Sequence, residues 1–255
     1  MNNVTLLVKT FKRPEHLERL LNSVEEHYPK LSVIVVDDSD VPYADEICGK
    51  YRNNDFMAYT MPYDIGLSAG RNAGLDTITT PYFVLCDDDH YFNSSLAIPL
   101  LLGALADGMD IAGGHYVEPN GRETRWDGLL VRRGEDVWGH RVPVERPYTR
   151  VEIVQNFFAA RTDEIKLLRW DDQIKIGTEH CDFFYRAKLR KLKVAYVPDA
   201  YVCHRHPEDA EEDGYQEARN RGMEFKHFYL EKHGVKRWWR FGARNPMSVD
   251  TKEPS

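Results

Sequence analysis

Three adjacent aspartates at the end of an apolar run are the residues of this sequence best suited to chemistry. The run Tyr82–Cys86 (YFVLC) is followed by Asp87, Asp88 and Asp89, and then by His90. Two like charges about 4 Å apart repel by roughly 4 kcal/mol at an effective dielectric constant near 20. A divalent cation would relieve this repulsion, and a cation held by one or two carboxylates completes its shell with substrate phosphates. The alternative is a solvated turn, the usual role of a run of charges.

A second group of candidate residues comprises Glu179, His180 and Asp182, which follow a turn marked by Gly177. When a substrate hydroxyl attacks carbon, a side chain of this kind can act as the general base that removes the proton. A helix is expected to begin here, and its dipole stabilises carboxylates in the first turn, so helix capping is the alternative role.

Two histidines form a third group. His204 and His206 follow an apolar stretch and are candidate metal ligands. Isolated histidines are usually structural or exposed. A nitrogen ligand from either one would favour Mn²⁺ over Ca²⁺.

Alternating strands and helices must position these groups. Apolar runs predict strands at residues 4–8, 33–36, 56–61, 82–86 and 111–116, with helices from Pro14 and at about 43–51, 66–78 and 94–106. This order predicts an α/β fold, a mainly parallel doubly wound sheet with helices on both faces. Such sheets bind ligands at the carboxyl ends of their strands, where Asp37, Asp38 and the three aspartates fall.

The second part of the chain is less regular. Residues 118–150 are rich in Gly, Pro, Arg and Trp and predict a functional or mobile loop. We expect strands at 151–160, 194–197 and 201–203, and helices at 181–192 and 215–233. Trp126 and Trp170 are candidates for stacking on an acceptor sugar, although Trp170 suits the core equally well. The tail KRWWRF is typical either of a peripheral membrane contact or of a segment packed on the domain.

Composition excludes several classes of protein. The 255 residues carry 34 basic and 41 acidic side chains, a net charge of −7, which argues against a nucleic-acid partner. Four cysteines without a CxxC motif argue against a zinc ribbon and favour a reducing compartment. No apolar run approaches the length of a membrane span, so we expect a cytoplasmic protein that touches a membrane peripherally if at all.

Four motifs together resemble the GT-A fold glycosyltransferases. LCDDDHYF resembles their DxD signature, and VTLLVKTFKRPEHLERLLNSV resembles the opening strand and helix of family 2-like members. VIVVDDSD resembles the second strand, and DIGLSAGRNAGL resembles a nucleotide-holding segment. The order and spacing match over about residues 3–206. Within this group, VQNFFAARTDEI and EHCDFF are similar to GM2/GD2-synthase-like β-1,4-N-acetylgalactosaminyltransferases.

The resemblance implies a Rossmann-like GT-A fold and a metal-dependent, inverting glycosyltransferase. Such an enzyme moves a sugar from a nucleotide diphosphate donor, expected to be UDP-linked, to a hydroxyl of a glycan or lipid-linked acceptor, with Mn²⁺ or Mg²⁺ as cofactor. It implies a GT-A domain at residues 1–206, divided into a nucleotide-sugar half (about 1–117) and an acceptor half (about 118–206). Residues 207–255 are expected to form a helical extension and tail.

The resemblance also implies roles for individual residues. Asp89 is expected to touch the metal most directly, and the position of His90 is not a ligand in the family pattern. The metal ligands are expected to be Asp87, Asp89 and His204. The nucleotide-sugar-binding residues are expected to be Thr10, Phe11, Arg13, Asp37, Asp38, Gly66, Arg71, Asn72, Asp87 and Asp88.

The catalytic base is less firmly implied. Many inverting members have an acid pair in which the second acid is the base, and His180 stands at that place here. An acid matches the position of Asp182 in the GM2-synthase-like motif. We therefore favour Asp182 as the base, expect Glu179 to hold acceptor hydroxyls, and keep His180 as the third candidate.

Two other classes of function use similar residues. A metal-dependent phosphohydrolase or nucleotidyltransferase could use the same carboxylates. Against a hydrolase with an aspartyl nucleophile, the first strand ends in Lys9 and Thr10 and carries no DxD motif. A non-catalytic nucleotide-sugar binder is the other alternative, and the candidate acids Glu179 and Asp182 argue against it.

Overall fold

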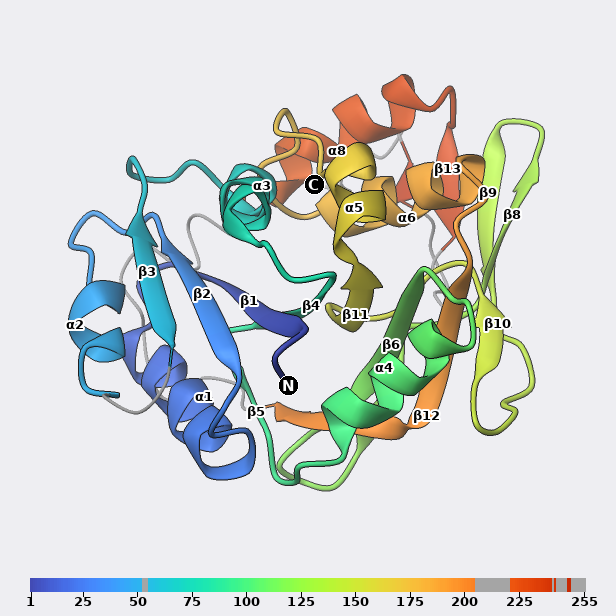
Figure 1. Ribbon diagram of the computed structural model, residues 1–255. Helices are drawn as coiled ribbons and strands as arrows, with labels where there is room; N and C mark the ends of the chain where they lie inside the picture. The colour runs from blue at the N-terminus through green and yellow to red at the C-terminus, as the bar shows by residue number, and fades with distance from the viewer. Residues whose placement is uncertain (52–54, 205–220, 240, 242–246, 249–255) are drawn as a thin grey trace.

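A large mixed β-sheet runs through the molecule (Figure 1). The computed structural model describes residues 1–51, 55–204, 221–239, 241 and 247–248. The sheet has the strand order β10-β12-β6-β11-β4-β1-β2-β3, with β5 paired to β12 and β7 paired to β6. Its strands are β1 (Val4–Thr10), β2 (Ser32–Asp37), β3 (Phe56–Thr60), β4 (Tyr82–Asp87), β5 (His90–Tyr91), β6 (Ile111–Val117), β7 (Glu123–Thr124), β10 (Thr149–Val151), β11 (Phe157–Arg161) and β12 (Val194–His204).

Helices cover both faces of this sheet, as expected. One apolar core contains residues of α1 (Pro14–His27), α2 (Ala44–Cys48) and α4 (Ala97–Ala106). The opposite core contains residues of α3 (Leu67–Thr77), α5 (Thr162–Leu168), α6 (Glu179–Leu189) and α8 (Gly222–Lys232). Figure 1 shows the second set of helices along the top of the view, with α1 and α2 at the left and α4 at the lower right. The predicted α/β fold is confirmed, although the sheet is mixed rather than parallel throughout.

Strand register explains why distant acidic residues meet. Strand β1 is buried over its whole length and pairs in parallel with both β2 and β4. Thr10 lies opposite Asp37 on one side, and Lys9 lies opposite Asp87 on the other. The carboxyl ends of three neighbouring strands therefore come together at one edge of the sheet, as the sequence predicted.

The segment at 118–150 is not the irregular loop that we expected. It contains β7 and β10, and it forms a hairpin of β8 (Leu129–Arg133) and β9 (Asp136–His140), which turns at Gly134 with φ +60°. Leu130 and Val137 are fully buried. The apolar residues of the hairpin are adjacent, as in Leu129–Val131 and Val137–Trp138, and do not alternate with polar ones. The period-two pattern from which half-buried strands are predicted is therefore missing.

The expected strand at 151–160 is divided in two. Strand β10 ends at Val151, and β11 begins at Phe157. Strand β11 lies between β4 and β6 and is antiparallel to both. It therefore extends the sheet from β4, the strand that precedes the three aspartates, to β6. The interval between the two strands includes Gln155 and Asn156, which both face a cavity described below.

The C-terminal aromatic segment packs on the domain. Strand β13 (Arg237–Trp239) pairs in parallel with β9 and antiparallel with β14 (Met247–Ser248), completing a second, four-stranded sheet. Trp238 is 1% exposed, and the ring of Trp239 stacks on Trp138 with centroids 4.4 Å apart. The packed alternative for KRWWRF therefore fits these residues.

Some expectations fall outside the described residues. They include His206, the first part of the helix expected at 215–233, and the boundary between the proposed domain and its extension at residue 206. Helix α8 accounts for the rest of that helix. Among the helices that the structure describes, none is both long and apolar enough to cross a membrane.

Candidate active site

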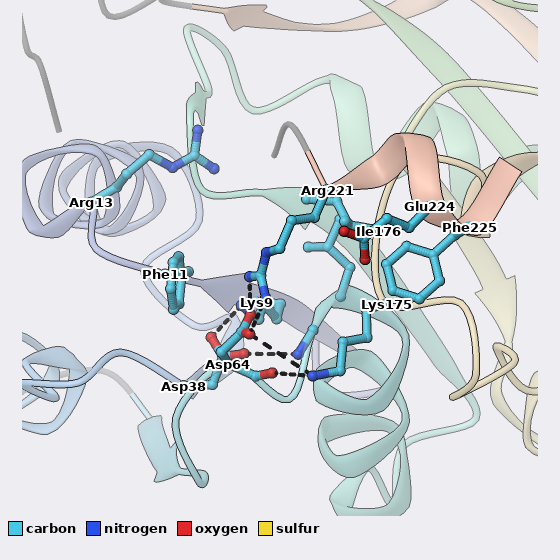
Figure 2. A pocket seen from close by; sticks show the side chains of 12 residues that line it. Lys9, Phe11, Arg13, Asp38, Asp64, Lys175, Ile176, Arg221, Glu224 and Phe225 are labelled. Atoms are coloured by element: carbon cyan, nitrogen blue, oxygen red, sulfur yellow. Dashed lines mark hydrogen bonds and ion pairs between the residues drawn. The ribbon is translucent and has the colours of Figure 1, made fainter. Parts of the chain in front are cut away.

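Two neighbouring cavities open at the carboxyl ends of the strands. The first, called the Phe11 cavity, has a volume of about 200 Å³ (Figure 2) and is lined by Lys9, Phe11, Arg13, Asp38, Asp64, Gly66, Leu67, Lys175, Ile176, Arg221, Glu224 and Phe225. The second, called the Asp89 cavity, has a volume of about 340 Å³. It is lined by Lys9, Arg13, Leu67, Asp87, Asp89, His90, Tyr116, Trp126, Gln155, Asn156, Ile176, Gly177, Glu179, His180 and His204.

The charges around the Phe11 cavity are mostly paired. Lys9 forms an ion pair with Asp38, and burial lowers the pKa of Lys9 despite that partner. Figure 2 shows Arg221 reaching from the start of α8 to Asp64, to which it donates two hydrogen bonds of 2.7 and 2.8 Å. Asp38 also accepts the backbone N–H of Gly66 at 3.0 Å. Two carboxylates thus sit on the wall of an apolar pocket, each neutralised by a basic side chain.

Gly66 is placed here for a conformational reason. Its φ is +93°, and a Cβ atom at this position would lie 2.7 Å from the Cβ of Lys175. Only glycine adopts this conformation freely and allows the close approach. Gly66 and Phe11, which the sequence predicted to bind the nucleotide sugar, both line this cavity.

Two predicted nucleotide-binding residues have positioning roles instead. Asp37 accepts backbone N–H groups from Ser39, Tyr43 and Ala44 at 2.8 to 3.1 Å and thereby shapes the loop after β2. Thr10 donates a 2.7 Å hydrogen bond to Asp88. Both side chains are fully buried, and neither belongs to the described lining of the two cavities.

Asn72 and Trp170 are likewise core residues, which corrects their predicted roles in binding. The Asn72 amide donates to the backbone oxygen of Trp170 at 2.9 Å and to Asp172 at 2.6 Å, and it accepts the Trp170 N–H. Trp170 is 4% exposed and stacks on Phe183 with ring centroids 4.6 Å apart. An acceptor sugar has no access to that ring in this conformation.

The three aspartates that follow β4 point to different partners. Asp87 accepts from Arg71 at 3.0 Å and from Asn156 at 3.2 Å. Asp89 accepts from Arg13 at 2.8 Å, and Arg13 also contacts Asp88. The repulsion inferred from the sequence is thus partly offset by two arginines, both of which had been predicted to lie here.

The pKa values of Asp88 and Asp89 are shifted in opposite directions. Asp88 is fully buried, and burial raises its pKa to about 6 despite the adjacent Arg13 guanidinium. Burial acts in the same direction on Asp89, but Arg13 and His204 outweigh it and hold the pKa of Asp89 well below its usual range. Asp88 therefore anchors Arg13 beneath the cavity floor, while Asp89 presents an ionised carboxylate to the cavity.

A group of side chains suited to a metal ion surrounds Asp89. Ligand atoms of Asp89, His90 and His204 all lie within 4.8 Å of one another. A carboxylate oxygen and imidazole nitrogens suit divalent transition metals such as Mn²⁺. Asp89 and His204 were predicted as ligands. Asp87 was also predicted, but it lies outside this group and binds Arg71, whereas His90, which the family pattern had set aside, lies within it.

Helix α6 delivers Glu179 to the same cavity. The preceding turn contains Gly177, whose φ is +92° and whose added Cβ would lie 2.8 Å from the Cα of Gly222. One carboxylate oxygen of Glu179 is 3.6 Å from Arg71, and the other is buried without a hydrogen-bond partner among the described residues. Burial raises the pKa of Glu179, which Arg71 only partly opposes.

His180 is a neutral, stacked residue of the cavity wall. Its ring lies against Trp126 with centroids 4.9 Å apart and 18° between the planes. Its Nδ1 is 2.5 Å from the side-chain oxygen of Asn156. Burial lowers the pKa of His180 to about 3, so the imidazole is a poor proton acceptor near neutral pH.

Asp182, which the sequence favoured as the base, is sequestered. It is fully buried and contacts Arg186 at 2.7 Å, Lys232 at 2.6 Å and His233 at 2.8 Å. Burial would raise its pKa, but these partners outweigh burial and lower the pKa to about 2. A carboxylate this acidic, outside the described lining of the Asp89 cavity, is unsuited to remove a substrate proton.

Sequence reasoning did not assign Lys9, Glu118, Asn156 or Arg221. Asn156 joins Asp87 to His180, and Glu118 lies 3.1 Å from Nδ1 of His204. Asn156 belongs to the VQNFF stretch that carried part of the resemblance, so its motif was a usable signal. Glu118 and Arg221 had none, because their partners lie 86 and 157 residues away in the chain.

The arrangement combines a buried carboxylate, one oxygen of which has no hydrogen-bond partner among the described residues, with basic side chains and candidate metal ligands. Glu179 can accept a proton inside the Asp89 cavity, and Arg13, which lines both cavities, can stabilise a departing anionic group. The Phe11 cavity adjoins the Asp89 cavity and offers an aromatic ring with flanking carboxylates. Such a layout suits group transfer from an anionic, two-part substrate.

Comparison with known proteins agrees with this layout. A family model described as Glycosyl transferase family 2 matches residues 5–193. Human β-1,4 N-acetylgalactosaminyltransferase 1 is 31% identical over 213 residues, which are 79% of this chain and 38% of that protein. Mouse β-1,4 N-acetylgalactosaminyltransferase 2 is 33% identical over 210 residues, which are 80% of this chain and 39% of that protein. The chain spans about two fifths of the length of these curated relatives.

Solved structures share the fold at lower sequence identity. S. aureus TarS 1-349 in complex with UDP-GlcNAc has a TM-score of 0.66 and 16% identity, over 89% of this chain and 65% of that one. GalNAc-T7 with UDP, GalNAc and Mn²⁺ has a TM-score of 0.64 and 14% identity, over 80% and 44%. These similarities confirm the GT-A fold. Because the family model covers more than half of the chain, the protein belongs to glycosyl transferase family 2.

Proposed function

We propose that this enzyme moves a sugar from a UDP-linked donor to a hydroxyl of a glycan or lipid-linked acceptor, with inversion at the anomeric carbon and with a divalent cation. The names of the relatives support N-acetylgalactosamine as the first sugar to test. The UDP and UDP-sugar in the titles of the solved structures support a UDP donor.

The observation that carries the proposal is the unpartnered carboxylate oxygen of Glu179. This oxygen is buried in the wall of the cavity that also exposes Asp89 and His204. A buried acceptor without a partner costs free energy, commonly 1 to about 3 kcal/mol, and is retained where a ligand completes it. An acceptor hydroxyl placed here donates its hydrogen to Glu179 and attacks the anomeric carbon. Glu179 takes the proton, and the sugar–phosphate bond breaks in the same displacement.

Basic side chains would stabilise the leaving group. Arg13 lines both cavities and supplies positive charge for the diphosphate. The buried Arg71 pairs with Asp87, lies 3.6 Å from Glu179 and adds positive charge from behind the lining. Asp89 and His204 would hold the Mn²⁺ or Mg²⁺ ion, which when bound supplies a Lewis acid for the leaving diphosphate. Arg13 already contacts Asp89 and is anchored by Asp88, so its guanidinium keeps its place beside the diphosphate.

The Phe11 cavity suits the nucleoside. Phe11 offers a ring face to a pyrimidine base, and Asp38 and Asp64 offer carboxylate oxygens to hydroxyl or N–H donors. In the Asp89 cavity, Trp126 and Gln155 lie near Glu179 and provide apolar and polar contacts for the acceptor. The shared wall, which includes Lys9 and Arg13, supports a position for the diphosphate between the two cavities.

The test is an assay of donor turnover with a defined panel. UDP-GalNAc, UDP-GlcNAc, UDP-Gal and UDP-Glc are each incubated with the enzyme, with Mn²⁺ or with EDTA, and UDP release is measured with water or simple sugars as acceptor. Release of UDP that requires the cation and is lost in Glu179→Gln supports the proposal. Hydrolysis of simple phosphate esters without turnover of any nucleotide sugar would instead identify a phosphohydrolase.

The stereochemistry is tested separately. Proton NMR of the product formed from an α-linked donor reports the coupling constant of the new anomeric proton. A β-linked product is expected from a single displacement. An α-linked product would exclude the single displacement and with it the role of Glu179 as the base of an inverting reaction.

A further inference from the structure

His90 lies beside the aspartates but is absent from the family pattern on which the metal ligands were predicted. It is 4% exposed and lines the Asp89 cavity. Its ligand atom, with those of Asp89 and His204, belongs to a group that lies within 4.8 Å. We propose that His90 is a direct metal ligand, so that the ion is held by one carboxylate and two imidazoles. This inference rests on the proposed metal-dependent function and specifies its cation site.

The backbone sets the two histidines side by side. The short strand β5 pairs antiparallel with β12, and its register places His90 directly opposite His204. Side chains of directly opposed residues in an antiparallel pair project from the same face of the sheet, with Cβ atoms about 5 Å apart. The two rings accordingly lie with centroids 5.5 Å apart and 68° between their planes.

Both imidazoles direct the same nitrogen toward Asp89. Nε2 of His90 is 3.9 Å from one carboxylate oxygen, and Nε2 of His204 is 3.6 Å from the other. Three ligand atoms therefore converge from two strands and the turn between β4 and β5. Each histidine approaches its own oxygen of Asp89, so one carboxylate and two imidazoles present ligand atoms to one another.

The second ring nitrogen, Nδ1, of each histidine contacts another buried side chain. Nδ1 of His204 is 3.1 Å from a carboxylate oxygen of Glu118, which is itself 5% exposed. Nδ1 of His90 is 3.6 Å from the sulfur of the fully buried Cys86. Histidine ligands commonly make such a contact through the nitrogen that does not bind the metal, which fixes the ring orientation. Both rings here have this arrangement.

The ordinary alternative is that His90 only packs against Tyr116, with ring centroids 5.5 Å apart. The two roles differ in their consequences for metal choice. Two imidazoles and one carboxylate favour transition metals, whereas Mg²⁺ prefers oxygen ligands. A second imidazole therefore predicts a marked preference for Mn²⁺ over Mg²⁺ that a packing residue does not confer.

The experiment counts nitrogen ligands of bound Mn²⁺ in the unmodified protein, with and without UDP, by electron spin echo envelope modulation. Two imidazole couplings are expected. Isothermal titration of Mn²⁺ and Mg²⁺ then compares His90→Gln with the matched control His140→Gln, whose side chain is exposed on β9. We expect His90→Gln to weaken Mn²⁺ binding at least about tenfold, a loss of the size seen when metal–histidine sites are disturbed. Mg²⁺ binding should change much less, and His140→Gln should change neither.

The outcomes separate this inference from the proposed function. A single imidazole coupling in the unmodified protein, or equal Mn²⁺ affinity in His90→Gln and His140→Gln, would overturn the role of His90 and leave the proposed glycosyl transfer standing. Absence of Mn²⁺ and Mg²⁺ binding under both conditions would overturn the metal-dependent function as well. If His90→Gln does not fold, the spectrum of the unmodified protein still decides the question.

Discussion

The Phe11 cavity and the Asp89 cavity share a wall but differ in how their buried charges are satisfied. Around the Phe11 cavity, Lys9 pairs with Asp38 and Arg221 pairs with Asp64. In the Asp89 cavity, Glu179 and His180 each keep a buried atom without a hydrogen-bond partner among the described residues. Paired charges suit recognition, because a ligand can exchange with them at little net cost. Unpaired groups suit chemistry, because a substrate completes them.

The same contrast recurs within one turn of α6. Glu179 and Asp182 are both buried acids, and their pKa values move in opposite directions. Burial dominates at Glu179, whereas three basic partners dominate at Asp182. The carboxylate with the raised pKa is the one that reaches the cavity, so the environment rather than the residue type distinguishes a base from a structural anchor.

The largest effect is expected for Glu179→Gln. Loss of the base should lower kcat by about 10²- to 10⁴-fold, the usual contribution of a general base. Stability should be unchanged or slightly higher, because a buried, poorly paired carboxylate is replaced by a neutral amide. Steady-state donor turnover and a urea titration measure both quantities. Retention of normal kcat would show that Glu179 is not the base.

Asp182→Asn should have the reverse effect: it should lower the stability of the protein and leave kcat nearly unchanged. The pKa of Asp182 falls from 3.8 to about 2 in the folded protein, and each pKa unit corresponds to about 1.4 kcal/mol. Removing the charge should therefore lower the free energy of unfolding by roughly 2 kcal/mol, somewhat less where its partly exposed partners are screened by solvent. The kcat of the folded fraction should change little.

Acid should reproduce this loss in the unmodified protein. Folding lowers the pKa of the Asp182 carboxyl group, so this group contributes to the free energy of unfolding at pH values above about 4. The contribution is lost as the pH falls toward 2. Urea titrations across this range test the sign. A kcat loss in Asp182→Asn as large as that of Glu179→Gln, at full stability, would show that Asp182 takes part in the chemistry.

The pH dependence of turnover probes the Asp89 cavity next. Glu179 must be deprotonated to act as a base, and burial raises its pKa above the usual 4.5. The value of kcat/KM should therefore fall about tenfold per pH unit below this raised pKa and level off above it. In Glu179→Gln, the small residual rate should lack this acidic limb. An unchanged limb in the variant would assign the titration to another group.

The smallest effect is expected in the Phe11 cavity. Phe11→Leu keeps an apolar side chain but removes the ring face, which should weaken binding of the nucleoside by about 0.5 to 1.5 kcal/mol. This corresponds to a rise in donor KM of up to about tenfold with kcat nearly unchanged. A fall in kcat with no change in KM would mean that the two cavities do not divide recognition and chemistry in this way.

The sequence was sufficient for the first half of the fold because its signals are local. Apolar runs such as Val33–Val36 form strands in a buried sheet, and parallel strands end at a common edge. The meeting of Asp37 with the acids after β4 follows from that order alone. The helices between them are marked by proline, by apolar spacing, and by small residues such as Gly74, whose added Cβ would lie 2.3 Å from Leu7.

Where the signals were weak or distant, sequence reasoning failed. The apolar residues of the β8–β9 hairpin are adjacent and do not alternate with polar ones, and its partner strand β13 comes about a hundred residues later. Asn72 was expected to bind the nucleotide, but its amide instead ties the backbone at Trp170 into the core. No pattern within the α3 motif reveals that partner.

By itself the sequence determined the fold family, the edge of the sheet that carries the site, and the cluster of acids that the site is built around. Only the tertiary structure decided which of those acids are available. Lys232 and His233 reach Asp182 from fifty residues away, and the register of β5 against β12 sets His90 opposite His204. The physical reason is that a carboxylate or imidazole owes its proton affinity and its ligand capacity to burial and to neighbours in space, and neither is encoded in the residues beside it in the chain.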